Sequence, residues 1–479
     1  MRYNKVLLVC PKFLKGRNRL AHFPLVGIGY VAEALNKAGI TVSVLDMNLG
    51  YEFCDLKDKI DQFKPDLVGF TAMTLGYKEF YGMVGEVKRL YPELKILLGG
   101  AHLSAVREQV FHDCPDIDYG IILEGDISIV QLCQGEDFNR IQGFVYRNNG
   151  KIITKQFGSF IENLDGLSFP KYESFELDKY LLKQISIVTS RGCPYDCIYC
   201  SVNASIGKKF RARSAQSIVE EIEYWYNRGY RQIFILDDNF TLLRKRVEDF
   251  CGLLAKKNFK DLRLKITSGI RADKTDRELL IALREIGVDY IAFGVEAASN
   301  KVLKSIKKGE DIEVIENGIK VACELGFTVD LFFLLGSPGE TMEDIKLSFN
   351  LARRYPVRRA IFYNLIPFPS TELLSWLKEK DYLIKPLDEI LNNASYYKNQ
   401  PCFYTPELSI KDRIEAFKMG QKVYIDVRSR FIEKRIKGPV FFKRIFSRLY
   451  ALPATEDLIN NNSLVLRAKE VIKKAFLNS

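Results

Sequence analysis

The chain has 479 residues, of which 47% are apolar, and a net charge of +11. This length exceeds one ordinary hydrophobic core, so we expect two domains and a smaller appendage. No apolar run reaches the roughly 18 residues of a membrane-spanning helix, and the start MRYNKVLLVCPKF shows no signal-peptide pattern, so we expect a cytoplasmic protein. Its ten cysteines are mostly scattered singly, which excludes a secreted disulfide framework. The positive charge gathers near the C-terminus, which argues against nucleic acid and favours a membrane surface or another anionic partner.

Short apolar runs alternate with helical patterns over the first region of the chain. The runs are KVLLVC, VSVLDMN, PDLVGFTAM, KILLGGAH and IDYGIIL, with helices predicted over residues 27–38 and 77–91. Near-continuous apolar strands separated by helices indicate a buried parallel sheet with helices on both faces. We therefore predict an α/β, Rossmann-like domain over residues 1–140. Ligands of such sheets bind beyond the strand C-termini, here in the loops at 11–22, 46–50, 71–77, 99–104 and 124–126.

A second series of strands and helices is predicted over residues 185–385. It is joined to the first by residues 141–184, which combine a hairpin at 143–154, signalled by its Asn-Gly pair, with a linker. Six strand-like runs from QISIVTS to RAIFYNLIP each precede a helical pattern, including a helix over 215–228. Six such units predict an open partial (β/α)6 barrel. Residues 386–479 form a helical, basic and aromatic module.

The segment SRGCPYDCIYCS places Cys193, Cys197 and Cys200 on one loop after the first strand of this barrel. Thiolates bind soft metals, and three on one short loop can converge on a single iron-sulfur cluster. A structural zinc or an inert cluster normally has four protein ligands, and no fourth cysteine lies nearby in sequence. Three ligands leave one iron of a four-iron cluster open. A zinc loop and three unrelated core cysteines remain as alternatives.

This C-x-x-x-C-x-x-C loop resembles that of the radical S-adenosylmethionine (SAM) superfamily. The resemblance implies a 4Fe-4S cluster whose open iron binds the amine and carboxylate of SAM. An electron donor such as flavodoxin or ferredoxin then supplies the electron that splits SAM into methionine and a 5′-deoxyadenosyl radical. The implied SAM contacts are Tyr199 and Gly336 near the adenine, Asp237, Asp238 and Asn239 near the amine, Ser268 and Arg271 near the carboxylate, and Glu296 near the ribose or amine. A solvated turn is the alternative for Asp237, Asp238 and Asn239.

A Rossmann-like domain before the cysteine loop, with LLGGAH and EGD motifs, is similar to the cobalamin-binding branch of this superfamily. The resemblance implies that the sheet edge cradles cobalamin, with contacts from Thr74, Leu75, Gly99, Gly100, His102, Glu124 and Gly125. A D-x-H-x-x-G motif is missing, because Leu20, Gly100 and Val110 stand two residues before the three histidines. We therefore expect no histidine beneath cobalt, with Thr74 or Leu75 at its lower face. Two alternatives stay open: a packing role for His102, and a relic domain that binds no cobalamin.

The resemblance implies hydrogen abstraction from an unactivated carbon, followed by methyl transfer to a lipid-like or secondary-metabolite substrate. The alternatives are oxidation, ring formation or carbon coupling by a related radical enzyme, and an iron-sulfur scaffold without catalysis. Methylthiolation of tRNA would need three further ligand cysteines in the first domain, and the Rossmann pattern and helical tail oppose it.

The segment RFIEKRIKGPVFFKRIFSRLYAL interleaves cations with apolar residues at helical spacing after Pro439. Such a pattern is typical of an interfacial helix on anionic lipid, and it predicts peripheral membrane contact through residues 439–452 on the cytoplasmic face. The alternative is a helix that packs its apolar face on the barrel with its cations in solvent. Cys402 stands alone in this module and indicates no second cluster.

Overall fold

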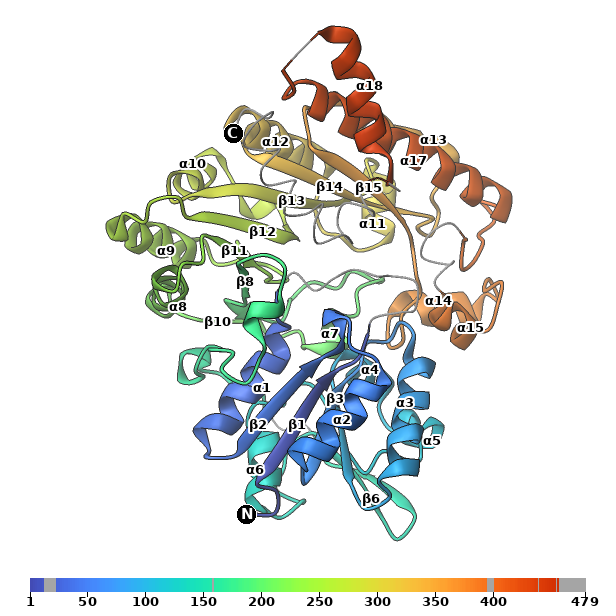
Figure 1. Cartoon of the computed structure of the whole chain (residues 1–479). Helices are drawn as coiled ribbons and strands as arrows, with labels where there is room; N and C mark the ends of the chain where they lie inside the picture. The colour runs from blue at the N-terminus through green and yellow to red at the C-terminus, as the bar shows by residue number, and fades with distance from the viewer. Residues whose placement is uncertain (13–22, 157–158, 394–399, 438, 454, 456–479) are drawn as a thin grey trace.

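The computed structural model describes residues 1–12, 23–156, 159–393, 400–437, 439–453 and 455 (Figure 1). Most of the predicted ligand loop at 11–22, with Leu20 and His22, lies outside these residues. No helix among them is long and apolar enough to cross a membrane.

The first third of the chain forms a seven-stranded sheet in the order β2-β1-β3-β4-β5-β6-β7. Its first five strands are parallel, as predicted. The strands are β1 Lys5–Cys10, β2 Thr41–Asp46, β3 Leu67–Thr71, β4 Lys95–Gly99, β5 Tyr119–Ile121, β6 Phe144–Asn148 and β7 Lys151–Thr154. The helices are α1 Val26–Lys37, α2 Phe53–Phe63, α3 Tyr77–Leu90, α4 Ala101–Val106, α5 Gln109–Asp113 and α6 Ser128–Gln134.

Helices cover both faces of this sheet because its strands are apolar on both sides. In β1, Val6 and Leu8 pack into one core cluster, and Leu7 and Val9 pack into another. The first cluster includes residues of α1 and α6, and the second includes residues of α2 and α3. Alternate side chains of a strand point to opposite faces, so an uninterrupted apolar run can be buried only between two helical layers.

The predicted hairpin at 143–154 extends this sheet. Strand β6 pairs antiparallel with β5, and β7 pairs with β6. The hairpin therefore covers the backbone of β5, which would otherwise be an exposed sheet edge. The linker that follows folds back onto the same domain, where Tyr180 donates a hydrogen bond to Asp46 Oδ2 over 2.8 Å.

The second sheet has six parallel strands in the order β15-β14-β13-β12-β11-β8. The strands are β8 Gln184–Ile187, β11 Gln232–Ile235, β12 Arg263–Ile270, β13 Val288–Glu296, β14 Thr328–Leu335 and β15 Arg359–Asn364. Within the described ranges no pairing joins β8 to β15, so the barrel is open. A small ladder of β9 Ser190–Arg191 and β10 Arg211–Ala212 frames the start of the cysteine loop.

Helices follow the strands of this sheet, and further helices form the C-terminal region. They are α7 Val202–Ser205, α8 Ala215–Asn227, α9 Arg244–Lys257, α10 Arg277–Glu285, α11 Asn300–Ser305, α12 Ile312–Glu324, α13 Met342–Arg354, α14 Glu372–Glu379, α15 Leu387–Asn392, α17 Ile410–Glu433 and α18 Val440–Ala451. Helix α17 packs on β15 and α13, and α18 packs on α17 (Figure 1). The predicted architecture, a Rossmann-like domain followed by a partial barrel and a helical module, is confirmed.

Candidate active site between the two sheets

A cavity of about 370 Å³ lies between the two sheets. Residues at the C-terminal ends of β3, β4 and β5 line it from the first sheet, and residues of β9 and of the turn after β11 line it from the second. Both sheets therefore contribute the strand ends at which α/β proteins bind ligands. The lining includes Gly99, Gly100, Glu124, Gly125, Arg191 and Asp238.

The three cysteines lie half-buried on the loop after β8. Three backbone hydrogen bonds hold this loop: Cys193 N donates to Gly207 O over 3.2 Å, Ile198 N donates to Ile306 O over 3.1 Å, and Cys200 N donates to Cys197 O over 3.0 Å. Burial raises the pKa of all three thiols, that of Cys200 to about 12. Binding a metal centre at these cysteines would displace the thiol protons, because the thiolate is the form that ligates metals.

The chemistry of this loop fits a 4Fe-4S cluster. Such a cluster binds each cysteine thiolate at a different iron, and this loop carries three cysteines within eight residues. Within the described residues no group of three or more His, Cys, Asp or Glu side chains is arranged to hold a single metal ion.

Tyr199, Glu296 and Lys308 lie together beside Cys197. The ammonium of Lys308 is 3.1 Å from Glu296 Oε1 and 3.6 Å from Glu310 Oε2. Burial disfavours the charged ammonium, but the two carboxylates and the nearby Cys197 keep the pKa of Lys308 above its usual value. Burial, reinforced by the charge of Glu296, raises the pKa of Tyr199. The sequence gives no prediction for Lys308, because lysine side chains are normally exposed.

The backbone holds Glu296 in an unusual conformation at the end of β13. Its φ is +63°, in the left-handed region that a residue other than glycine rarely adopts. Strain of this kind is maintained only where the surrounding contacts fix it, and it concentrates at functional sites.

The three residues after β11 have separate environments. Asp237 accepts hydrogen bonds from Thr189 N over 2.6 Å and from Ser190 Oγ over 2.5 Å, so it anchors the chain that leads into the cysteine loop. Asp238 lines the cavity, and burial together with the charge of Asp237 raises its pKa to about 6. Asn239 is buried, and its amide group has no hydrogen-bond partner within the described ranges. Asp238 and Asn239 are therefore available to a ligand, whereas Asp237 is already engaged.

Arg271 uses all its side-chain nitrogens on the protein itself. It donates to Lys308 O over 2.7 Å and to Gly309 O over 2.9 Å, and its Nε is 3.0 Å from Asp273 Oδ1. These contacts fix the segment that carries Lys308. Ser268 is exposed near the end of β12.

The loop after β14 is closed by residues from the C-terminal region. Gly336 N and Ser337 N donate to Glu340 Oε2 over 2.6 and 3.0 Å, and Arg413 of α17 donates to Gly336 O over 3.0 Å. The φ of Gly336 is +92°, and an added Cβ would lie 1.7 Å from Arg413 Nη1. Only glycine fits this position. Burial raises the pKa of Glu340 to about 7.

The first sheet gives the cavity a floor of backbone and small side chains. Gly99, Gly100 and Gly125 all line it. A Cβ at Gly100 would lie 2.6 Å from Thr71 Oγ1, so the chain at this point has no room for a side chain. A floor of this kind lets a large flat ligand approach the backbone closely, and it fits cobalamin.

Arg191 joins the two domains at the edge of the cavity. It forms a bidentate pair with Asp126, at 2.8 and 3.0 Å, and contacts Glu124 Oε1 over 2.9 Å. Arg211 contacts the same Glu124 oxygen over 2.6 Å, and Ile161 N donates to its Oε2. Glu124 is thus used between the domains. The sequence predicts Asp126 only as part of the ligand loop at 124–126, and it gives no prediction for Arg191, although an arginine two residues before the first cysteine is an available signal.

Three other residues predicted to contact cobalamin do not line the cavity. Thr74 and His102 are buried, and Leu75 is partly buried. His102 stacks on Tyr77 at a centroid distance of 4.7 Å, its Nε2 is 2.7 Å from the Tyr81 hydroxyl, and burial lowers its pKa to about 4. These contacts are those of a packed side chain. Met73, which the sequence analysis missed, lines the cavity instead.

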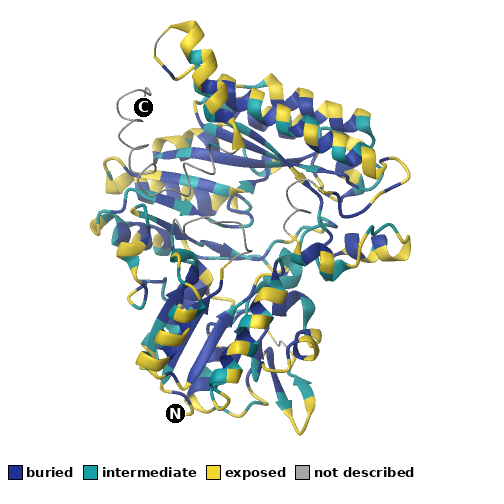
Figure 2. Ribbon diagram, turned by 45° about the vertical axis from the view of Figure 1, so that its right-hand side comes forward, coloured by how far each residue is buried: buried dark blue, intermediate teal, exposed yellow. Residues whose placement is uncertain are grey.

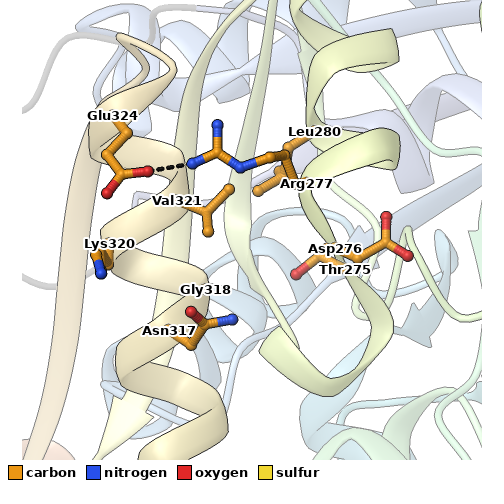
Figure 3. Close-up of a pocket in the computed structure, with 9 residues that line it drawn as sticks. All are labelled: Thr275, Asp276, Arg277, Leu280, Asn317, Gly318, Lys320, Val321 and Glu324. Atoms are coloured by element: carbon orange, nitrogen blue, oxygen red, sulfur yellow. Dashed lines mark hydrogen bonds and ion pairs between the residues drawn. The ribbon is translucent and has the colours of Figure 1, made fainter.

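A second hollow lies between α10 and α12 (Figure 3). Arg277 and Glu324 form an ion pair across it. It contains none of the predicted site residues.

Comparison with known proteins agrees with this arrangement. The radical SAM superfamily model matches residues 187–352, and the B12 binding domain model matches residues 17–132. The chain is a radical SAM protein with a B12-binding domain. This radical SAM enzyme has a 4Fe-4S cluster, SAM and cobalamin as its cofactors, as predicted.

Two curated relatives are each 28% identical to this radical SAM enzyme. An uncharacterized methyltransferase of Pyrococcus horikoshii, PH0819, matches over 394 residues, 80% of this chain and 85% of that protein. The anaerobic magnesium-protoporphyrin IX monomethyl ester cyclase of Rubrivivax gelatinosus matches over 399 residues, 78% of this chain and 70% of that protein. The fold is shared with the radical SAM methyltransferase TsrM of Kitasatospora setae, solved with cobalamin and a 4Fe-4S cluster bound. The TM-score is 0.72 at 18% identity, covering 95% of this chain and 99% of that one.

Proposed function

We propose that this enzyme methylates an unactivated carbon of a lipid-like substrate. When bound, SAM at the cluster supplies hydrogen abstraction and cobalamin supplies the methyl group. The observation that supports the proposal is the cavity between the two sheets, because glycines of the first sheet and residues that flank the cysteine loop line the same space. The methyltransferase relative supports the reaction type.

Residues of the second sheet hold SAM in this proposal. Cys193, Cys197 and Cys200 bind the cluster, and Asp238 and Asn239 receive the methionyl amine. Asp238 is ionised above its pKa of about 6, so it can pair with the ammonium group at neutral pH. Glu296, held by Lys308, and Tyr199 lie beside the same loop and contact the nucleoside.

Residues of the first sheet hold cobalamin. Gly99, Gly100 and Gly125 would contact the corrin and its nucleotide tail, and Met73 would contact the cofactor instead of Thr74 or Leu75. The ion pairs of Arg191 hold the two domains together, so the two cofactor sites would keep their separation across the cavity.

The test uses enzyme whose cluster and cobalamin are reconstituted without oxygen, with flavodoxin or ferredoxin as the electron donor. Lipid extract from a strain that lacks the gene is incubated with SAM deuterated on its methyl group. We expect a lipid that gains the deuterated methyl group, together with one 5′-deoxyadenosine and one S-adenosylhomocysteine per product. If the substrate is converted without gaining the label, the reaction is oxidation or ring formation and not methylation. Ring formation is the reaction for which the cyclase relative is named. Absence of SAM cleavage would leave only a scaffold role.

A further inference from the structure

Helix α18 exposes its large apolar side chains and buries its small ones. Ser447 and Ala451 are its buried residues, and the helix packs on α17. Phe441 is 77% exposed, Phe442 is 54% exposed and Leu449 is 57% exposed. Figure 2 shows this helix as largely exposed. A helix of a water-soluble protein normally has the opposite arrangement, with its large apolar residues toward the core.

The exposed apolar residues of α18 form one continuous surface. Within the described residues, seven of the seventeen exposed large apolar side chains fall in residues 440–452, and the other ten are spread over the rest of the chain. The rings of Phe442 and Phe446 stack at 5.9 Å, and those of Phe446 and Tyr450 stack at 5.8 Å, which joins successive turns of the helix. A contiguous surface of this kind marks a binding site, whereas scattered apolar residues do not.

The charges around this surface have one sign. Residues 434–455 contain six Lys or Arg residues and no Asp or Glu. Lys443, Arg444 and Arg448 of α18 make no ion pair within the part of the chain that the structure describes. The partner of this surface is therefore apolar in its interior and anionic at its boundary.

We propose that α18 lies in the interface of an anionic membrane, with Phe441, Phe442 and Phe446 among the acyl chains and the flanking cations at the lipid phosphates. Two other occupants fit the charge less well. A second copy of the chain would bring the same six cations against this surface. Residues 456–479 carry four Lys or Arg and three Asp or Glu, so they provide no net negative charge.

This surface belongs to the same helical unit that reaches the barrel. Helix α18 packs on α17, and Arg413 of α17 contacts the loop after β14. Membrane binding would thus bring the barrel near the bilayer that contains a lipid-like substrate. The inference goes beyond the proposed methyl transfer, and either of the two can fail alone.

The experiment measures flotation of the full-length holoenzyme with vesicles. One set contains phosphatidylcholine with phosphatidylglycerol, and the other contains phosphatidylcholine alone. We expect at least about tenfold stronger binding to the anionic vesicles, weakening as salt is raised, because both cation attraction and apolar insertion contribute. The double variant Phe441→Asp with Phe446→Asp should lose this binding.

A matched control carries the same charge change elsewhere. Val314 of α12 and Leu347 of α13 are also exposed, so Val314→Asp with Leu347→Asp adds two carboxylates away from α18. This control should bind vesicles as the parent does. Both double variants should form 5′-deoxyadenosine at the parent rate, which would show that they are folded. The rate of SAM cleavage thus tests the radical chemistry independently of membrane binding. Equal binding by the parent and the α18 variant overturns the proposal. So does a dimer in the absence of vesicles that the α18 variant dissociates.

Discussion

The two sheets approach their shared cavity with different chemistry. The first contributes glycines, aliphatic side chains and the carboxylates of Glu124 and Asp126, whereas the second contributes Arg191, Asp238 and two serines that flank the cysteine loop. The first sheet can therefore bind a large preformed cofactor through shape and backbone contacts. The second must assemble a charged metal centre and hold an ammonium and a carboxylate beside it. Where the two domains meet, Arg191 of β9 contacts Glu124 and Asp126 of the first domain, so one polar cluster connects the largely apolar lining of the first sheet to the cysteine loop.

The largest expected effect comes from a change in the cysteine loop, which should affect the cluster and leave the first sheet unchanged. Cys197→Ala should abolish both the 4Fe-4S cluster and SAM cleavage, because no other cysteine on this loop can replace the missing ligand, while cobalamin stays bound to the first sheet. Iron and sulfide analysis, EPR and quantification of 5′-deoxyadenosine measure these changes. Cys54→Ala, at an exposed cysteine, is the control and should retain all three properties. Residual SAM cleavage in Cys197→Ala would contradict the assignment.

The contact between the sheets is the next test. Arg191→Gln should lower the free energy of unfolding by about 3–5 kcal/mol, because it leaves the buried carboxylate of Asp126 without its counter-ion. Urea unfolding without oxygen measures this loss. The double variant Arg191→Gln with Asp126→Asn should recover much of it, since neither charge then remains. A loss below about 1 kcal/mol would show that the ion pair is dispensable.

This pair also predicts a dependence on pH. Burial opposes ionisation of Asp126, but Arg191 outweighs it and holds the pKa of the carboxyl below its usual value. A depressed carboxyl pKa stabilises the fold above the unfolded value of about 3.9, and this contribution is lost as the pH falls through the folded value. The stability difference between the parent and the double variant should therefore shrink below about pH 4.

A third change fills the cavity from the first sheet. At Gly125 an added Cβ would have Ile121 Cγ2 at 3.8 Å and Val31 Cγ2 at 3.9 Å as its nearest neighbours, so the backbone accepts a side chain. Gly125→Leu should then occupy the cavity and weaken cobalamin binding by about a hundredfold, or about 2.7 kcal/mol, with the cluster unchanged. Titration of the apoprotein followed by UV-visible spectra measures both. Gly82→Leu, on an open part of α3, should bind cobalamin normally.

The smallest expected effect concerns His102. Its folded pKa of about 4 lies below the unfolded value of about 6.5, so protonation favours the unfolded chain. Stability should fall as the pH drops from 6.5 toward 4, with a contribution of about 2 kcal/mol between pH 7 and pH 5. Urea unfolding of the parent and of His102→Phe at these two values isolates it. Equal pH slopes in the two proteins would show that folding does not lower the pKa of His102.

Local sequence patterns were sufficient for the architecture. The apolar runs of the first sheet are long enough to read as strands buried on both faces, and the helix predicted over residues 215–228 is observed as Ala215–Asn227. The cysteine spacing indicated the cofactor chemistry because the three predicted ligands are neighbours in the chain. Each of these features depends on contacts within a short segment.

Contacts between distant segments were not predictable in this way. Arg191 and Asp126 are far apart in sequence, and only the docking of the two sheets brings them together. Asp237 and Asp238 look equivalent in the sequence, yet the turn directs one into the protein and the other to the cavity. Met73 rather than Thr74 or Leu75 lines the cavity because the rotation of a loop after its strand is set by what it packs against.

The contact between Arg413 and Gly336 has a consequence for how the chain can be shortened. The guanidinium occupies the volume beside the glycine and donates to its carbonyl oxygen. A protein truncated before Ile410 would lose α17 and α18, and with them the Arg413 side chain that contacts the loop after β14. The conformation of this loop therefore depends on the C-terminal region.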